Sequence, residues 1–264
     1  MKIKQIRNAT LKVTFGGVTF LVDPWLVKKH GMGSFVDIPG HPFSVPDPVK
    51  EQLPMPFYDL PEPVEKVLEG VDYYLLTHIH PDHIDMSPDG TIGAPLDKNI
   101  PILTQNEQDA AVLKKSGFKN ITVMTEQGIN VGKVKIIKTP TLHGTIKPEG
   151  KACGVIFETA GEEKLYIVGD TIWYEKIKET LLTQKPDVIV MNTCAAELVG
   201  NGRLIMNDED VECVAVTSPQ AKIVLSHMDN VAHATITRKS MRGLMAMRGI
   251  ENYYMPADGE TLTF

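Results

Sequence analysis

Blocks of apolar residues separated by turn-forming residues recur along this chain and predict a protein with many strands. Residues 10–23 (TLKVTFGGVTFLVD) place β-branched runs on both sides of Gly16-Gly17, which predicts a hairpin because glycine readily adopts the positive φ of a tight turn. Further strands are expected at residues 72–77, 100–105, 121–125, 133–139, 154–159 and 164–170. The last four of these follow one another at short intervals, which is typical of a large, largely antiparallel sheet.

From residue 173 onward the pattern changes to alternating helices and strands. Helices are expected at residues 174–182, 207–217 and after Ala234, with strands between them at 187–192 and 222–227. Two earlier helices are expected at residues 63–69 and from the N-cap Asn106 to about Lys115. The final residues, 252–264, predict a closing hairpin over Asp258-Gly259. This mixture predicts an α/β fold, and a chain of 264 residues fits one large domain that spans residues 1–264.

A proline-rich segment at about residues 37–63 interrupts this succession of elements. Eight of the 18 prolines lie between Pro39 and Pro63, a density that excludes a helix interior or a central strand. We expect a long ordered loop or lid, because Phe43, Phe57 and Tyr58 should pack against something. A flexible linker between domains is the alternative.

Two pairs of strand ends resemble each other and indicate an internal repeat. FLVDP at residues 20–24 is similar to YIVGDT at 166–171, and LLTHIHPDH at 75–83 is similar to VLSHMDNVAH at 224–233. If the likeness reflects two related halves, the carboxyl ends of their strands meet at one edge of a two-sheet sandwich. Chance similarity is the alternative, because the residues that favour strands are few.

Composition and charge narrow the class of protein. The formal charge of −6 gives no basic field for a phosphate backbone, so nucleic-acid binding is not expected. The chain shows neither a signal-peptide core nor an apolar run long enough for a membrane span. Cys153, Cys194 and Cys213 are scattered among apolar residues, as reduced core thiols in the cytosol would be. We therefore expect a cytoplasmic protein that acts on a small molecule, anionic molecules included, and a homo-oligomer is compatible with the sequence.

The stretch THIHPDHID at residues 77–85 concentrates metal-binding side chains directly after an apolar strand. His78 and His80 are two positions apart and point the same way in extended backbone, so both imidazoles can bind one ion. Asp82 and His83 follow after a proline and would face a second ion. Imidazole and carboxylate together suit zinc, manganese or iron, and no thiolate pair lies nearby for a structural zinc finger. The stretch therefore predicts a catalytic metal site.

Two ions need further ligands, and three other strand ends provide them. His143 follows the strand at 133–139, Asp170 ends the strand at 164–170, and His227 ends the strand at 222–227. Each alone is more often a satisfied structural side chain than a ligand. Together with the four side chains of the THIHPDHID stretch they form a complete set for two ions.

The pattern H-x-H-x-D-H with downstream His, Asp and His resembles the metallo-β-lactamase superfamily over residues 9–227. That resemblance implies a four-layer αββα sandwich with one metal held by His78, His80 and His143, a second by Asp82, His83 and His227, and Asp170 bridging the two. It also implies that Asp23, at the end of the second hairpin strand, orients the histidine stretch by hydrogen bonding. The alternative for Asp23 is a turn former before Pro24.

Within the superfamily, RNATLKVTFGGVTFLVDPWL and THIHPDHID are most similar to ascorbate-6-phosphate lactonase-like and phosphodiesterase-like proteins. We expect a metal-dependent hydrolase in which a hydroxide bridging two divalent metals attacks an ester, lactone or phosphoester of a small molecule. Zinc is favoured by the ligand types, with manganese and iron as alternatives. A non-catalytic or regulatory metal-binding protein and a nuclease-type phosphodiesterase are the other candidates.

Two residues are candidates for proton transfer. Asp82 is the expected proton acceptor beside the attacking water. His233 is expected to donate a proton to the leaving group or to bind an anionic part of the substrate, with a structural histidine as the alternative. Lys28, Lys29 and Arg203 are candidate anion contacts, although solvated surface is the usual state of such side chains.

Overall fold

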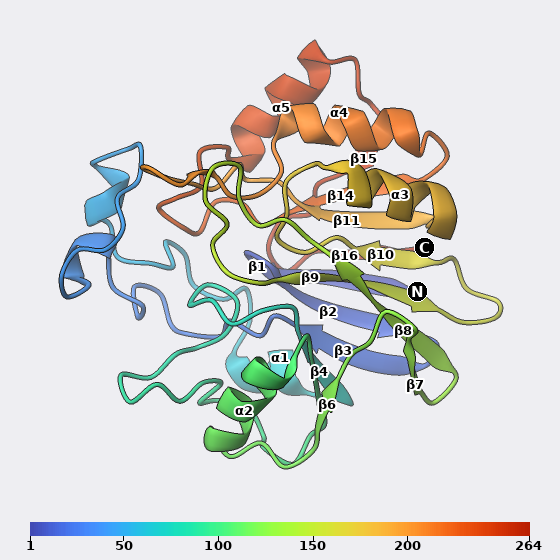
Figure 1. Cartoon of the computed structure of the whole chain (residues 1–264), viewed down its shortest axis with the longest axis horizontal. Coiled ribbons are helices and arrows are strands. Elements are labelled where there is room, and N and C mark those ends of the chain that lie inside the picture. The colour runs from blue at the N-terminus through green and yellow to red at the C-terminus, as the bar shows by residue number, and fades with distance from the viewer.

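Two seven-stranded sheets lie face to face in the computed structural model, which describes all 264 residues (Figure 1). The first sheet has the order β16-β1-β2-β3-β4-β5-β6 and consists of β16 (Thr261–Thr263), β1 (Lys2–Arg7), β2 (Thr10–Phe15), β3 (Val18–Val22), β4 (Tyr73–Leu76), β5 (Ile102–Thr104) and β6 (Ile121–Val123). The second has the order β15-β14-β11-β10-β9-β8-β7 and consists of β15 (Tyr253–Tyr254), β14 (Lys222–Ser226), β11 (Val188–Asn192), β10 (Leu165–Ile167), β9 (Cys153–Glu158), β8 (Val134–Pro140) and β7 (Ile129–Val131). A small ribbon joins β12 (Glu197–Leu198) to β13 (Gly202–Arg203).

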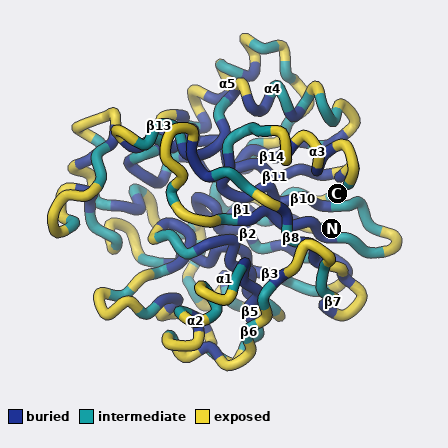
Figure 2. The backbone as a smooth tube through the Cα atoms, in the orientation of Figure 1, coloured by how far each residue is buried: buried dark blue, intermediate teal, exposed yellow.

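Helices cover the outer face of each sheet. The first sheet carries α1 (Val64–Leu68) and α2 (Glu107–Lys115), and the second carries α3 (Glu175–Gln184), α4 (Asp208–Thr217) and α5 (Arg238–Met247). Three apolar clusters fill the spaces between the four layers: one between the sheets, around Phe20 and Phe157, and one beneath each set of helices. The strands at the centre are accordingly buried in Figure 2. The structure therefore confirms the expected αββα sandwich.

The hairpin predicted at residues 10–23 is present, and Gly16 and Gly17 both have positive φ, at 59° and 80°. The four strands expected between residues 121 and 170 were predicted to form one largely antiparallel sheet, and this prediction is correct only in part. Strands β8, β9 and β10 pair antiparallel as expected, but the strand predicted at 121–125 is β6, which pairs parallel with β5 in the other sheet. Helix α2 connects β5 to β6, and such a crossover makes neighbouring strands parallel. Strand β1 was not predicted.

The predicted closing hairpin at residues 252–264 is wrong. Strand β15 pairs parallel with β14, whereas β16 pairs antiparallel with β1, so the two strands belong to different sheets. Pro256 lacks the N–H that a ladder between them would need. The turn at Asp258-Gly259 instead hydrogen-bonds to Gln5, with Gly259 N 2.7 Å from Gln5 O, and carries the chain from one sheet to the other.

Of the two pairs of similar strand ends, one pair occupies matching positions in the two sheets. Strands β3 and β10 occupy the fourth position of their sheets, where antiparallel pairing changes to parallel pairing. Strands β4 and β14 do not correspond, because β11 is the counterpart of β4. The carboxyl ends of the parallel strands in both sheets therefore point to a shared edge of the sandwich.

The proline-rich segment packs against the chain around this edge instead of linking two domains. It contains two short 3-10 turns, η1 (Phe35–Asp37) and η2 (Lys50–Gln52). Met55 is fully buried, Lys50 Nζ donates to Ala234 O at 2.9 Å, and Phe57 N donates to Asn230 O at 3.2 Å. These contacts join the segment to the residues that follow β14.

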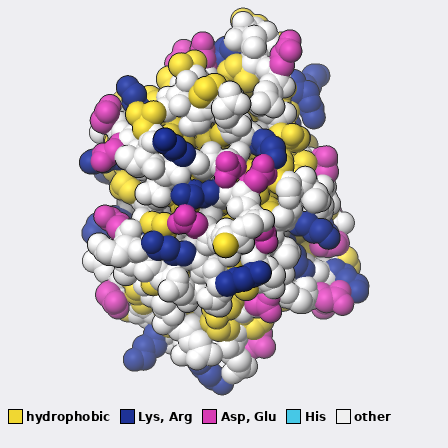
Figure 3. All heavy atoms as spheres, turned by 90° about the vertical axis from the view of Figure 1, so that its right-hand side faces the viewer, with side chains coloured by type: hydrophobic (Ala, Val, Ile, Leu, Met, Phe, Trp, Pro, Cys, Tyr) yellow, Lys and Arg dark blue, Asp and Glu magenta, His cyan; other side chains and the backbone are white.

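The opposite face of the molecule, which carries both chain ends, shows basic and acidic side chains interspersed (Figure 3). No large area of one sign lies on this face. None of the helices combines the length and the apolar content that a bilayer span requires.

Candidate metal centre

All seven predicted ligands come together at the shared edge of the sandwich. Four of them lie in the turn after β4, and the other three follow β8, β10 and β14, so both sheets contribute. Three groups have ligand atoms close enough to share an ion: His78, His80 and His143; His78, His83 and Asp170; and Asp82, His83 and His227. Six of the seven side chains are buried, and His80 is half-buried at the entrance.

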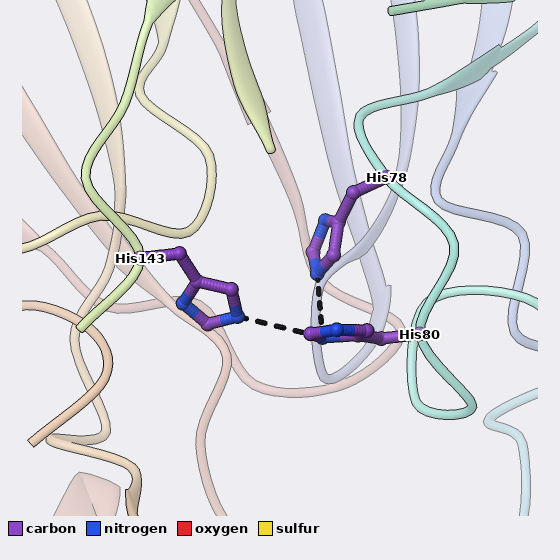
Figure 4. Close-up of side chains that lie close together, drawn as sticks. All are labelled: His78, His80 and His143. Atoms are coloured by element: carbon purple, nitrogen blue, oxygen red, sulfur yellow. Dashed lines mark hydrogen bonds between the residues drawn. The ribbon is translucent and has the colours of Figure 1, made fainter. Parts of the chain in front are cut away.

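The first group is a set of three imidazoles whose ring nitrogens face one another (Figure 4). His78 Nε2 lies 3.0 Å from His80 Nδ1, and His143 Nε2 lies 3.4 Å from the same atom. Ligands held at about 2.0–2.1 Å from a tetrahedral zinc ion are roughly 3.3 Å apart, so the observed spacing fits three nitrogens that share one cation.

The second group has the same character and includes one carboxylate. His83 Nε2 lies 3.1 Å from His227 Nε2, which lies 3.4 Å from Asp82 Oδ2. Asp170 Oδ2 lies between the two groups, 3.2 Å from His83 Nε2 and 3.6 Å from His143 Nε2. Its position is the one that a carboxylate bridging two ions would need.

The outward-facing atoms of these side chains have partners that fix their orientation. Asp23 accepts hydrogen bonds from Thr77 N and Thr77 Oγ1, both at 2.8 Å, and its Oδ2 lies 2.9 Å from His83 Nδ1. Further contacts join His143 Nδ1 to Leu204 O, His227 Nδ1 to Cys194 Sγ and Asp170 Oδ1 to Asn192 Nδ2. A ring nitrogen that is occupied in this way leaves the other nitrogen free to bind a metal.

The electrostatics of the site also favour bound cations. Burial opposes charge on Asp82 and Asp170, but the neighbouring imidazoles outweigh it and hold the pKa of both carboxyls well below the usual range. Burial likewise opposes a charged His83, yet Asp170, Asp23 and Asp82 raise the pKa of that imidazole to about 10. Buried carboxylates that stay ionised need compensating positive charge, which divalent ions supply more strongly than protonated histidine.

Five imidazoles and two carboxylates therefore fit a pair of divalent ions that accept nitrogen and oxygen ligands, such as zinc, manganese or iron. His233, the other catalytic candidate, lies beside this set, with Nε2 3.5 Å from Asp82 Oδ2 and the ring packed edge-on against Phe35. Its Nδ1 atom is buried without a partner. Arg203 is not in the site, because it pairs with Asp210.

Asn8 is a site residue that the sequence analysis missed. It lies in the turn between β1 and β2, is fully buried, and places Nδ2 3.2 Å from Asp82 Oδ2 and 3.3 Å from His227 Nε2. An Asn between two alternating strands predicts only a turn, so the sequence carries no signal for this contact.

A small cavity of about 80 Å³ opens beside His80, Asp82 and His233. The other lining residues are mostly apolar: Met32, Phe35, Phe43, Pro81, Leu198 and Leu204, together with Glu149. The proline-rich segment and the residues just before it contribute Met32, Phe35 and Phe43. No Lys or Arg lines the cavity. Two carboxylates do, those of Asp82 and Glu149.

The chain is similar to known proteins over its whole length. A family model described as a beta-lactamase superfamily domain matches residues 40–228, which include all seven candidate ligands. The chain is 35% identical over 269 residues to the UPF0173 protein YddR of Bacillus subtilis, with 100% of both chains covered.

Two solved structures share this fold closely. The isothiocyanate hydrolase from Delia radicum gut bacteria has a TM-score of 0.89 and 36% sequence identity, and the match covers 100% of this chain and 99% of that one. A possible metal-dependent hydrolase from Veillonella parvula has a TM-score of 0.89 and 34% identity, with the same coverage.

Proposed function

This chain belongs to the β-lactamase superfamily domain family of metal-dependent hydrolases, and on that premise we propose that it uses two divalent metal ions to hydrolyse a small, uncharged electrophile. An isothiocyanate is the substrate class we favour, and a small apolar lactone or ester is the second candidate. The proposal rests on one observation: seven candidate metal ligands lie beside an apolar cavity that no Lys or Arg lines.

Each ion has a ligand set in this proposal. His78, His80 and His143 hold one, Asp82, His83 and His227 hold the other, and Asp170 lies between them. The chemistry that such a pair supplies is a water whose pKa is lowered to about 7 and polarisation of the bond under attack. Asp23 keeps His83 turned toward the ions through its contact with Nδ1.

Proton transfer is assigned to Asp82 and His233. Asp82 Oδ2 faces the same space as Nε2 of His227 and Nε2 of His233, so it can accept a proton from the attacking water. His233 Nε2 lies 3.5 Å from that oxygen and lines the cavity, so it can pass a proton on to the leaving atom of the substrate.

The lining of the cavity supports an uncharged substrate. A nucleic acid would place further phosphates beyond the metal centre, next to Glu149 and with no Lys or Arg to offset them. An apolar group would instead contact Phe35, Phe43 and Leu204, whose burial against it is favourable. This argument disfavours the nuclease alternative, and the substrate panel tests the phosphodiesterase alternative.

The 36% identical structure is named as an isothiocyanate hydrolase, which supports the same substrate class here. In this reaction water adds across the C=N bond of R–N=C=S: oxygen bonds to the central carbon and a proton goes to nitrogen. This addition gives R–NH–C(=S)–OH, and transfer of the proton from oxygen to sulfur gives the thiocarbamate R–NH–C(=O)–SH. The thiocarbamate then breaks its C–N bond and transfers its thiol proton to nitrogen. The products are the amine R–NH₂ and carbonyl sulfide, so no oxidant or other reactant is needed.

Metal analysis followed by a substrate panel tests the proposal. Protein purified from its own host under anaerobic conditions should contain two ions per chain, and zinc is the ion we expect. Loaded protein should release amine and carbonyl sulfide from benzyl isothiocyanate and leave a phosphodiester and a β-lactam intact, with a γ-lactone as the second candidate. Full metal content without hydrolysis of any of these compounds would favour the regulatory alternative.

A further inference from the structure

Asn8 is held rigidly at the metal centre by its main chain. Its carbonyl oxygen accepts hydrogen bonds from His227 N at 3.1 Å, Ser226 Oγ at 3.1 Å and Gln5 Nε2 at 2.8 Å. Its φ of 53° lies in the left-handed region, where asparagine is tolerated and glycine is favoured. None of these features depends on the side-chain amide, so the position of the backbone and the role of the amide can be separated.

The amide group of Asn8 contacts one residue twice. Nδ2 lies 3.1 Å from the main-chain oxygen of Asp82 and 3.2 Å from its carboxylate Oδ2. Nδ2 also lies 3.3 Å from His227 Nε2. Because both Asp82 atoms are oxygens, the amide atom that faces them must be the N–H donor. The two contacts join the main chain of Asp82 to its side chain and so resist rotation of the carboxylate.

The other atom of the amide argues against a purely local role. Asn8 Oδ1 is buried without any partner. An asparagine that served its own turn would use this oxygen to accept a nearby main-chain N–H, and a buried carbonyl oxygen without a donor is destabilising. The amide is therefore oriented for Asp82 at a cost to the turn in which it lies.

We infer that Asn8 is a positioning residue for Asp82, which fixes the carboxylate with Oδ2 toward His227 and His233. This inference rests on the proposed function, in which Asp82 is a metal ligand and proton acceptor. Asp82 is the only carboxylate in its group of three candidate ligands, so the orientation of its oxygens affects both the binding of the ion and the transfer of the proton.

The substitution Asn8→Gly tests the inference, since glycine keeps the left-handed backbone and removes only the amide. Metal affinity is measured by competition with a chromophoric chelator, and cobalt(II) is used to follow the visible spectrum of the bound ions. We expect affinity for one of the two ions to fall roughly 10- to 100-fold, with a changed cobalt spectrum. The metal-free forms of the variant and of the unsubstituted protein should melt at similar temperatures.

The neighbouring Ala9→Gly is the matched control. It adds backbone freedom to the same buried turn without touching the amide, so it should lower the melting temperature and leave metal affinity within twofold. If Asn8→Gly binds metal and cobalt as the unsubstituted protein does, the inference is wrong. Should the glycine variant fail to fold, Asn8→Ser gives the same comparison, because its hydroxyl is too short to reach both oxygens.

An Asp82→Ala variant in the same assay separates the two proposals. Loss of one ion from Asp82→Ala together with normal binding by Asn8→Gly would overturn the role of Asn8 alone. Unchanged metal binding by Asp82→Ala would overturn the proposed metal centre and the role of Asn8 with it.

Discussion

Oδ2 of Asp23 lies 2.9 Å from Nδ1 of His83, although 60 positions of sequence separate the two residues. The pairing of strands explains the contact. Strands β3 and β4 are parallel neighbours with Val22 opposite Leu75, so the residues that follow them emerge side by side. Asp23 is therefore placed to orient the histidine turn before any metal binds.

We predict that Asp23→Asn weakens metal binding roughly 10- to 100-fold, the usual cost of losing a group that orients a ligand. The amide can still contact Thr77 but cannot offer its nitrogen as an acceptor to His83. Equilibrium dialysis with zinc measures the change. Asp72→Asn is the control, because Asp72 accepts from Thr19 N at the opposite end of the same strands; equal losses in the two variants would contradict the prediction.

Asp170→Asn should remove one bound ion or sharply lower activity. An amide has no negative charge with which to bridge two cations, although it has nearly the size and shape of the carboxylate. Metal content per chain and turnover are measured together. Asp187→Asn serves as a comparison, since Asp187 accepts from Lys164 N at the far end of β11. Normal metal content and turnover in Asp170→Asn would refute the bridging position.

His233→Ala is expected to lower kcat about 10²- to 10⁴-fold, the range for loss of a general acid or base, with metal content unchanged. His233 contacts the proposed proton acceptor but belongs to none of the three groups of candidate ligands. His30→Asn is the matched variant, because His30 is exposed and asparagine tolerates its φ of 64°. A loss of metal from His233→Ala would show that its role had been misassigned.

Phe43→Ala should raise KM for benzyl isothiocyanate roughly tenfold, or about 1.4 kcal/mol of binding energy. The ring is half-buried in the wall of the cavity and packs against Phe35. We expect kcat and metal content to change little. A fall in kcat with an unchanged KM would mean that Phe43 does not contact the substrate.

Removal of the metal with a chelator should lower the melting temperature. Ions present at 100 times their Kd stabilise the folded state by about 2.7 kcal/mol per site. For a chain of this size that is a shift of roughly 5–10 °C for each site that is emptied. Differential scanning calorimetry before and after chelation, and again after zinc is restored, measures it. Coincident melting curves would contradict a metal centre that assembles only in the folded state.

The candidate ligands could be predicted because each one follows an apolar strand, and the carboxyl ends of parallel strands meet at one edge. His143, Asp170 and His227 had only this local pattern, and all three lie in the site. The orienting contacts could not be predicted in the same way. Asn8 and Cys194 reach the site through turns whose geometry depends on how β1 and β11 pair, and their own neighbours in the sequence carry no sign of it.

The strands at the chain ends show the same limit. Tyr253 and Thr261 flank a good turn sequence, and local propensity favours a hairpin between them. Their pairing is decided instead by β14 and β1, the strands next to the edge of each sheet. Local patterns therefore predicted the elements well and the partners of edge strands poorly.

Each proposed ion takes ligands from both sheets of the sandwich. His78 and His80 extend from the first sheet and His143 from the second, while Asp82 and His83 face His227 in the same way. Such an ion would add a cross-link to the apolar packing and the hydrogen bonds that otherwise join the two halves. The two sheets of the loaded protein should then lose their amide protection against hydrogen exchange as one unit, whereas in the stripped protein either sheet could open alone.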